Sequence, residues 1–279
     1  MEPELVAGVY PSPSLRPRLA FWSAGYLLLA FPLVLIAYQG LPIPLGPNSA
    51  IPRALLVALV LLLVTRALLR REGRSPSELG LSFSARAAKH VVLALGAGAL
   101  LFATAALLLR VVLPFEWELN RTILPHAITG ALLFHLATNA CEELAWRGYA
   151  FEGLLRAVGH WPAQLIVALV AAFFHVLSGW SWEVALISTT TGSLLFALVF
   201  LRWRSVPAAI GVHAAWNWTR DLILTPAAAT SIWMPKGMEN WTLTQWNIAQ
   251  AIFVGVTLFA CAGLLLSLRS RTEIAQLPA

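Results

Sequence analysis

The chain has 279 residues, of which 59% are hydrophobic and only 11% are charged. Soluble domains average about 45–50% apolar and about 25% charged residues. With a mean hydropathy of +0.75, the composition excludes an ordinary soluble domain and indicates an integral membrane protein. The net charge of +6 comes mostly from arginines beside apolar segments, which is the pattern of the positive-inside rule. We therefore expect a surrounding lipid bilayer and no nucleic-acid partner.

Apolar segments fill most of the chain. Those long enough to cross about 30 Å of hydrocarbon lie near 19–38, 52–69, 90–114, 127–150, 161–179, 183–201, 205–224 and 247–268. The predicted fold is all-α, a polytopic bundle of about eight transmembrane helices. We find no repeat and no second domain, so 19–268 is predicted to be a single transmembrane domain between an N-terminal tail, 1–18, and a C-terminal tail, 269–279.

Basic residues predict the orientation. With the N-terminus inside, most of the 19 Lys and Arg residues fall on the inner side, and the connection 70–81 is the most basic of all. We therefore expect both tails in the cytoplasm. Usage rich in arginine and poor in lysine points to a bacterial source, so we expect a multi-pass protein of the bacterial inner membrane. The connection 40–48 is predicted to be a tight outer loop, because Gly and Pro cluster there.

One predicted membrane helix carries charges. Residues 139–149 contain Glu142, Glu143 and Arg147, and each ionised group near the bilayer centre costs roughly 2.5–3.5 kcal/mol. Glu143 and Arg147 are four residues apart with the acid first, the favourable order for a helical ion pair. Glu142 points to another side of the helix and stays free of that pair. The residues predicted to share the face of Glu142 by i+3 and i+4 spacing are Asn139 and His135.

Further polar residues lie in two other apolar segments. His175 is late in the fifth segment, and His213 and Asn217 are one helical turn apart in the seventh. A single histidine in an apolar helix is most often a packing or hydrogen-bonding residue. Costly polar groups on three helices are better explained if they converge. We therefore expect one polar site, with a functional core at about 127–218.

The residue types fit hydrolysis of a peptide bond. A carboxylate beside an imidazole can take a proton from water. A second imidazole and a carboxamide can donate hydrogen bonds to the oxyanion that develops. A buried arginine can keep the neighbouring carboxylate ionised.

These motifs resemble the CPBP family of intramembrane proteases, which includes type II CAAX prenyl endopeptidases, bacteriocin-processing and self-immunity (Abi) proteins, and some bacterial sorting proteases. The family pattern is Glu-Glu-x-x-x-Arg, Phe-x-x-x-His and His-x-x-x-Asn on successive helices. Residues 142–147 match the first block completely, and 213–217 match the third. The second block keeps His175 but has Ala171 where Phe is usual, with Phe173 and Phe174 closer to the histidine.

The resemblance implies a glutamate-type mechanism. Glu142 would be the general base that activates water, aided by His175. His213 and Asn217 would form the oxyanion hole. The substrate would be a membrane-associated peptide or protein, such as a CAAX-like tail, a leader peptide or a C-terminal sorting signal.

Glu143 and Arg147 would support this site. We expect no cofactor, although zinc is an alternative, because Glu/His/His sets can bind it. Against zinc, the chain has neither a His-Glu-x-x-His helix nor a third unambiguous ligand. The ligands in a metal-dependent enzyme would be Glu142, His175 and His213.

Two questions stay open at this level. A non-enzymatic immunity or scaffold protein could keep the polar cluster for structure, and such a protein would tolerate Glu142→Gln. The connection 226–244, which we expect outside, would either lie on the membrane surface or cover the site as a lid. The sequence does not identify the substrate, the cleaved bond or the oligomeric state.

Overall fold

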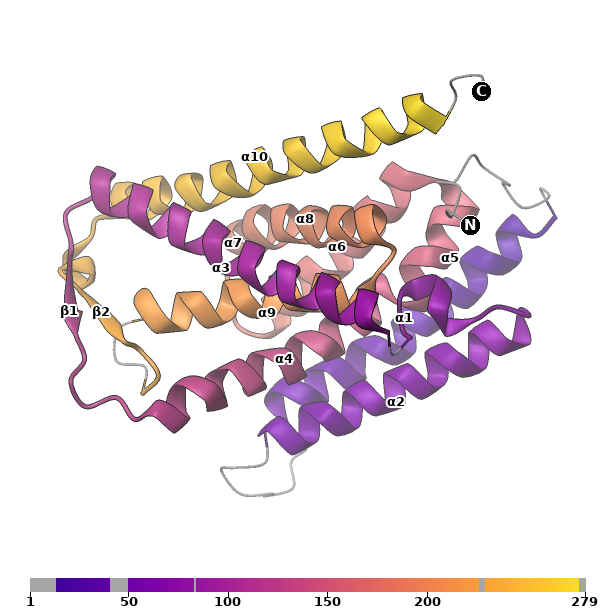
Figure 1. The fold of residues 1–279 in the computed structure, drawn as a ribbon, viewed down its shortest axis with the longest axis horizontal. Helices are drawn as coiled ribbons and strands as arrows, with labels where there is room; N and C mark the ends of the chain where they lie inside the picture. Colours follow the sequence, from indigo (N-terminus) through magenta and orange to yellow (C-terminus); the bar gives the residue numbers. More distant parts are fainter. Residues whose placement is uncertain (1–13, 41–49, 83, 226–228, 276–279) are drawn as a thin grey trace.

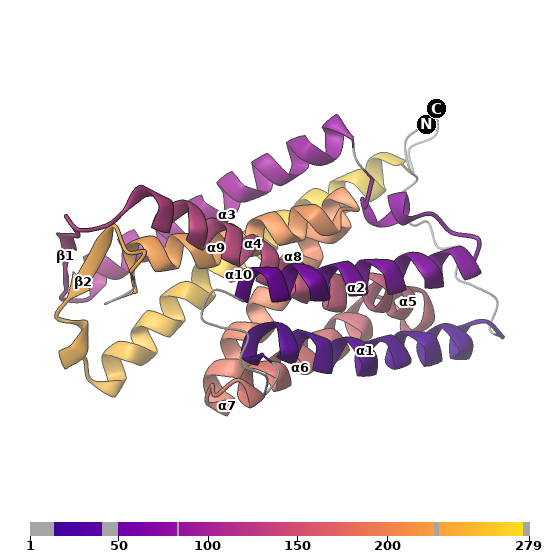
Figure 2. The same ribbon diagram turned by 90° about the horizontal axis from the view of Figure 1, so that it is seen from below.

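The computed structural model describes residues 14–40, 50–82, 84–225 and 229–275. Most of these residues are helical (Figures 1 and 2), which confirms the all-α prediction. The long helices are α1 (Arg16–Gln39), α2 (Ala50–Arg71), α3 (Ala85–Val112), α4 (Pro125–Arg147), α6 (His160–Leu177), α8 (Thr190–Trp203), α9 (Val206–Ile223) and α10 (Leu243–Ala275). The shorter ones are η2 (Pro76–Leu79), α5 (Tyr149–Val158), α7 (Trp182–Val184), η3 (Ala185–Thr189) and η4 (Met238–Asn240).

Helices α4 and α9 lie in the middle of the bundle. Figure 1 shows α1 and α2 on one side of this pair, and α3, α8 and α10 on the other. α9 packs most extensively against α3 and α4, while α4 also packs against α1 and α2. The polar motifs predicted from the sequence are therefore on the two central helices.

Burial is arranged as expected for a protein in lipid. The C-terminal half of α4 is almost entirely buried, including its charged residues. The outer helices instead expose large apolar side chains, such as Leu100 and Val111 of α3 and Phe259 of α10. Six helical segments, α1, α2, α3, α6, Trp182–Trp203 and α10, are long and apolar enough to cross a membrane. The chain is thus an integral, multi-pass membrane protein.

Each of the eight predicted segments corresponds to a helical region, but α4 and α9 are not among those six. Their polar residues lower their mean hydropathy, so these helices depend on the protein interior rather than on lipid. α1 begins and α10 ends at the same end of the bundle (Figures 1 and 2). The placement of both tails in the cytoplasm stays a prediction. α10 continues past the predicted boundary at 268, and most of both tails and the connection 41–49 lie outside the described residues.

The predicted segment 127–150 is divided into α4 and α5 at Gly148. A Cβ atom at this position would lie 2.2 Å from the carbonyl oxygen of Leu144, so only glycine allows the chain to turn so tightly. α5 was not predicted. It packs against α1 and α6. The turn at Gly148 therefore ends α4, the helix that carries the Glu-Glu-x-x-x-Arg motif, directly after Arg147.

Helices α3 and α9 approach closely through a glycine. A Cβ atom on Gly98 would lie only 2.3 Å from the carbonyl oxygen of Val212. Small residues at helix crossings allow such backbone contact in membrane proteins. Because His213 follows Val212, this contact helps to fix the position of a motif residue.

An ionic cluster joins the connection after α2 to α5 and to the end of α8. Arg74 contacts Glu78 at 2.8 Å and Glu152 at 3.0 Å, and Glu152 also accepts a hydrogen bond from Arg204 at 2.8 Å. Burial disfavours ionisation of Glu78, but hydrogen bonds from the Ser75 backbone N–H and from Arg74 outweigh it and lower the pKa of this carboxyl. The connection that is most basic in the sequence is therefore joined to α5 and to the end of α8 by ion pairs.

Two short strands form a feature that was not predicted. β1 (Glu116–Leu119) pairs antiparallel with β2 (Trp233–Lys236), and Trp117 lies opposite Pro235. The indole N–H of Trp117 also donates to the carbonyl oxygen of Ile223 at 2.6 Å. Part of the connection 226–244 is therefore packed at the C-terminal end of α9, and residues 226–228 lie outside the described part of the chain.

Candidate functional site

The predicted pair between Glu143 and Arg147 is present in α4. The guanidinium Nη1 of Arg147 lies 3.2 Å from Glu143 Oε1, and both side chains are almost completely buried. Nη2 of Arg147 donates to the carbonyl oxygen of Ser193 at 2.9 Å and to its Oγ at 2.7 Å. The two charges therefore compensate each other within α4, and the hydrogen bonds of Arg147 to Ser193 join α4 to α8.

Three polar pairs connect α4 to α9. His213 Nδ1 lies 2.9 Å from Glu143 Oε1, Asn217 Nδ2 lies 3.4 Å from Asn139 Oδ1, and His135 Nε2 lies 2.7 Å from Asp221 Oδ2. On both helices the members are four residues apart, so each helix contributes one face. We call these three pairs the polar ladder. Its members are His135, Asn139 and Glu143 on α4 and His213, Asn217 and Asp221 on α9.

The polar ladder corrects one expectation. His135 and Asn139 were predicted to share the face of Glu142, but they are aligned with Glu143 toward α9. Spacings of three and four residues both place side chains on neighbouring positions of a helix, so spacing alone did not separate the two glutamates. Asp221 was not predicted as a member of the site.

The protonation of His213 follows from its partner. A carboxylate only accepts hydrogen bonds, so Nδ1 of His213 carries the proton that it shares with Glu143. The imidazole ring stacks on Phe196 with centroids 4.2 Å apart, and the guanidinium carbon of Arg147 lies 5.5 Å from the centroid of the same phenyl ring. These contacts fix the orientation of the imidazole ring. Because Nδ1 is bonded to Glu143, Nε2 is the ring nitrogen that can act on a substrate.

Glu142 faces away from the polar ladder. Its Oε1 accepts a short hydrogen bond from the hydroxyl of Tyr38, the penultimate residue of α1. The prediction that Glu142 would stay apart from the Glu143–Arg147 pair is therefore confirmed. Tyr38 was not predicted, because it is 104 residues away in the sequence and no spacing rule relates the two positions.

His175 lies near the end of α6 and is partly exposed. Its Nδ1 donates to the carbonyl oxygen of Ala171 at 2.8 Å, and its ring contacts Trp180. The described residues show no hydrogen bond between His175 and Glu142. The buried ring of Phe174 contacts the residues next to both side chains: its centroid lies 5.5 Å from that of Tyr38, the partner of Glu142, and 5.2 Å from that of His175 itself.

Several polar atoms in this region have no hydrogen-bond partner among the described residues. They include Nδ2 of Asn139, Oε2 of Glu143 and Nε of Arg147. Buried polar atoms without partners are rare in folded proteins because each one costs free energy. A donor and an acceptor free on adjacent turns of α4 give the interior a place that can bind a polar group.

The region with this geometry also has recognisable relatives. Residues 124–219 match the family described as Type II CAAX prenyl endopeptidase Rce1-like. The match runs from the start of α4 into α9, so it includes Glu142, Glu143, Arg147, His175, His213 and Asn217. A comparison with curated proteins finds no significant match.

The Rce1-like match confirms the resemblance drawn from the motifs. At the level of the family it supports peptidase activity on a membrane-associated peptide or protein. The helices on either side of the matched region complete the bundle, since α1 supplies the partner of Glu142 and α3 packs against α9.

No metal-binding cluster is formed by the residues that the structure describes: no three His, Cys, Asp or Glu side chains are grouped to hold an ion. The alternative zinc set divides between two sides of α4. Glu142 faces α1, whereas His213 is bonded to Glu143 on the side of α9.

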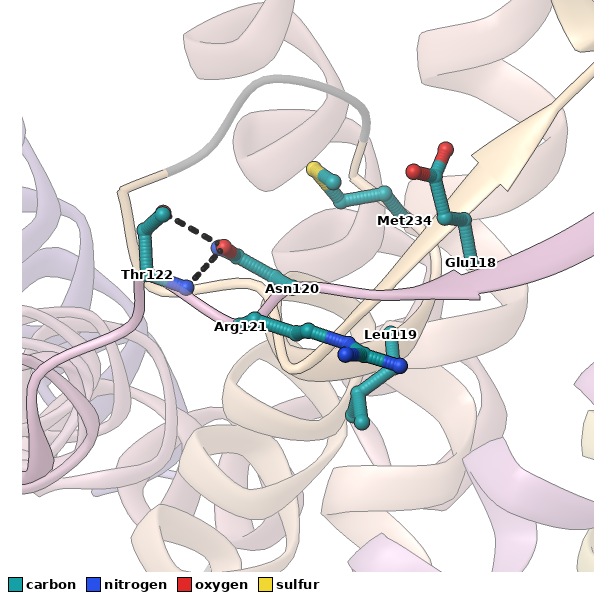
Figure 3. Close-up of a pocket in the computed structure, with 6 residues that line it drawn as sticks. All are labelled: Glu118, Leu119, Asn120, Arg121, Thr122 and Met234. Carbon is teal, nitrogen blue, oxygen red and sulfur yellow. Dashed lines mark hydrogen bonds between the residues drawn. The ribbon is translucent and has the colours of Figure 1, made fainter.

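A separate pocket lies beside the two strands (Figure 3). Asn120 Oδ1 accepts hydrogen bonds there from the backbone N–H of Thr122 at 3.0 Å and from its hydroxyl at 2.7 Å. None of the six residues that line this pocket belongs to the motifs. The lining residues are Glu118, Leu119, Asn120, Arg121, Thr122 and Met234.

Proposed function

We propose that this protein is a glutamate-type intramembrane endopeptidase of the bacterial inner membrane. Glu142 is the general base that takes a proton from water, and His175 aids it. The observation that carries the proposal is the polar ladder, which fixes His213 and Asn217 next to the helix of Glu142. The Rce1-like match over the same residues supports hydrolysis of a peptide bond.

The hydrogen bond of His175 suits this role. A carbonyl oxygen only accepts, so Nδ1 of His175 carries a proton and donates it to Ala171. In the tautomer with the proton on Nδ1 alone, Nε2 is an acceptor that can orient a water molecule or receive its proton. Trp180 packs against the ring and limits its rotation.

His213 and Asn217 are proposed to stabilise the oxyanion. The Nδ1–H of His213 is held by Glu143, so in the imidazolium form the N–H at Nε2 is the donor for an oxyanion. A preorganised donor in such a dry site is worth a factor of about 10²–10³ in rate. Asn217 adds a carboxamide donor one turn away.

A second assignment uses the same atoms in another way. A neutral His213 has Nε2 as an acceptor, and the pair with Glu143 then resembles the imidazole–carboxylate pairs that act as general bases. In this assignment Arg147, which contacts the same carboxylate oxygen, would hold Glu143 in place beside the ring. Glutamine variants of Glu142 and Glu143 separate the two assignments.

The proposed substrate is a membrane-associated peptide or protein tail, such as a CAAX-like tail, a leader peptide or a C-terminal sorting signal. We propose catalysis without a metal, because carboxylate and imidazole can activate water together. The competing function is an immunity or scaffold role that uses the polar ladder for stability alone.

Mass spectrometry of protein termini tests the proposal. Membranes from cells expressing the wild type are compared with membranes from cells expressing Glu142→Gln at equal protein levels. We expect a defined set of new termini only with the wild type. If Glu142→Gln produces the same termini, Glu142 is not the base. If neither protein changes the termini of any membrane protein, the scaffold function is favoured.

A further inference from the structure

Helix α1 contributes a side chain to the proposed base. The hydroxyl of Tyr38 donates to Oε1 of Glu142, because a carboxylate can only accept. Among the described residues, this is the one hydrogen bond that the carboxylate of Glu142 makes. The second carboxylate oxygen, Oε2, accepts no hydrogen bond within the described part of the chain.

The end of α1 is held in place by two other helices. Arg53 of α2 donates from Nε to the carbonyl oxygen of Ala37 at 3.1 Å and from Nη2 to that of Tyr38 at 3.5 Å. Gln39 donates to a carbonyl oxygen at the C-terminal end of α6 at 3.2 Å. The ring of Tyr38 packs edge-on against Phe174. The hydroxyl therefore reaches Glu142 from a fixed frame, and the same frame holds the end of α6 that carries the proposed helper histidine.

We propose that Tyr38 is a positioning residue for Glu142: its hydroxyl fixes Oε1 and leaves Oε2 to meet the water that is activated. This inference rests on the proposed role of Glu142 as the base. Loss of the hydroxyl should therefore leave the carboxylate of Glu142 without its one side-chain hydrogen bond and free to rotate away from the water.

Other ionisable groups lie near Glu142, but none of them donates a hydrogen bond to it. Cys141 and Arg147 on its own helix interact with it electrostatically. Groups on the neighbouring helices are engaged elsewhere: Arg53 of α2 with α1 carbonyls, Tyr149 of α5 with Glu72, His213 of α9 with Glu143, and His175 of α6 with Ala171. The effect of removing the tyrosine hydroxyl is thus specific to Tyr38.

Infrared difference spectroscopy tests the hydrogen bond without a substrate. Spectra of the purified full-length protein in detergent are recorded at one pH, and the carboxyl bands that are lost in Glu142→Gln are assigned to Glu142. In Tyr38→Phe, which keeps the ring and its packing, we expect the frequencies of these bands to shift, because the carboxylate has lost its hydrogen bond. Unchanged frequencies would overturn the inference.

Cleavage kinetics test the positioning role. The probe is a fluorogenic peptide with a farnesylated CAAX-type C-terminus. With Tyr38→Phe we expect kcat to fall by roughly tenfold or more while KM changes little, because the tyrosine acts on the base and not on the bound peptide. Shifted carboxyl bands with unchanged kcat would show that the hydrogen bond does not position the base, and would overturn the inference.

Tyr26→Phe is the matched control. Tyr26 is also on α1, and its hydroxyl also bonds to α4, but not to Glu142. This hydroxyl lies 2.9 Å from Thr65 Oγ1 and donates to the carbonyl oxygen of Leu144 at 3.0 Å. Its removal should affect stability without shifting the carboxyl bands of Glu142 or lowering kcat. Equal band shifts and equal losses of kcat in both variants would mean a general loosening of α1, which contradicts a specific role for Tyr38. If Glu142→Gln still cleaves the peptide, the proposed function fails, and the infrared spectra still report on the hydrogen bond.

Discussion

Removing either member of the Glu143–Arg147 pair should destabilise the fold, and the two losses should differ. Glu143 is fully buried and is contacted by Arg147 at 3.2 Å and by His213 at 2.9 Å. Arg147 is also buried, and its other described partner, Ser193, is neutral. We therefore predict a larger loss for Glu143→Gln than for Arg147→Met.

The magnitude follows from the charges left behind. Breaking a buried pair costs roughly 3–5 kcal/mol because one charge loses its compensation. In Glu143→Gln, the guanidinium of Arg147 loses the carboxylate that it contacts and keeps Ser193, the ring of Phe196 and an electrostatic interaction with Glu142, so we expect the upper part of this range. In Arg147→Met, the carboxylate of Glu143 keeps its hydrogen bond with His213, so we expect the lower part. The double variant should recover some of the loss, because no isolated charge remains.

The assay combines folded yield in detergent, the midpoint of thermal unfolding and peptide cleavage. Glu142→Gln is measured in parallel and should fold like the wild type, while its cleavage rate falls by about 10²–10⁴. A greater loss of stability in Arg147→Met than in Glu143→Gln would refute the charge argument. An active Glu142→Gln beside a folded but inactive Glu143→Gln would instead assign the base to the Glu143–His213 pair.

Four further predictions concern the rest of the site and its supports. Cleavage should survive prolonged treatment with strong chelators; loss restored by stoichiometric zinc would contradict the metal-free mechanism. A double-mutant cycle of His135→Gln and Asp221→Asn should give a coupling on the order of 1 kcal/mol, and zero coupling would remove this rung of the polar ladder. Gly98→Ala should lower the thermal midpoint, because its Cβ would meet an α9 carbonyl oxygen at 2.3 Å, whereas Gly96→Ala has open space and should not. Because the pKa of Glu78 is lowered in the folded protein, its ionised carboxylate stabilises the fold at pH values above the pKa that this carboxyl has in the unfolded chain. This stabilisation is lost as the pH falls through the pKa of the folded state. The free energies of unfolding of the wild type and Glu78→Gln should therefore converge in acid.

Local spacing predicted those features of the site that lie within one helix. The order of Glu143 and Arg147 predicted their ion pair, and the structure contains it. The i, i+4 spacing of His213 and Asn217 predicted a shared face, and both residues point to α4. Composition predicted the membrane bundle, because apolar content and low charge are properties of the whole chain.

Contacts between distant segments could not be predicted in the same way. Tyr38 meets Glu142 only because α1 crosses α4 at this level, and nothing in the sequence of α1 marks its penultimate residue. Asp221 did leave a signal, since it continues the four-residue spacing of α9. Its place beside Arg220, near the end of the predicted segment 205–224, fits a charge at a helix end equally well. The split at Gly148 was hidden because the apolar pattern continues into α5.

The polar ladder determines how α4 and α9 align, and this alignment places the reactive groups. In lipid, the different registers of two purely apolar helices have similar free energies, because sliding one helix along the other exposes similar apolar surfaces. A shift of one turn would set Glu143 opposite Asn217 and Asn139 opposite Asp221, so the buried carboxylate would lose its imidazole and His135 would lose its acid. Each broken rung leaves a polar group without its partner in the interior, where that is costly. The costly polar residues of α4 and α9 therefore fix the register in which His213 and Asn217 reach the motif helix, while the apolar helices around them need only hold the pair in the membrane.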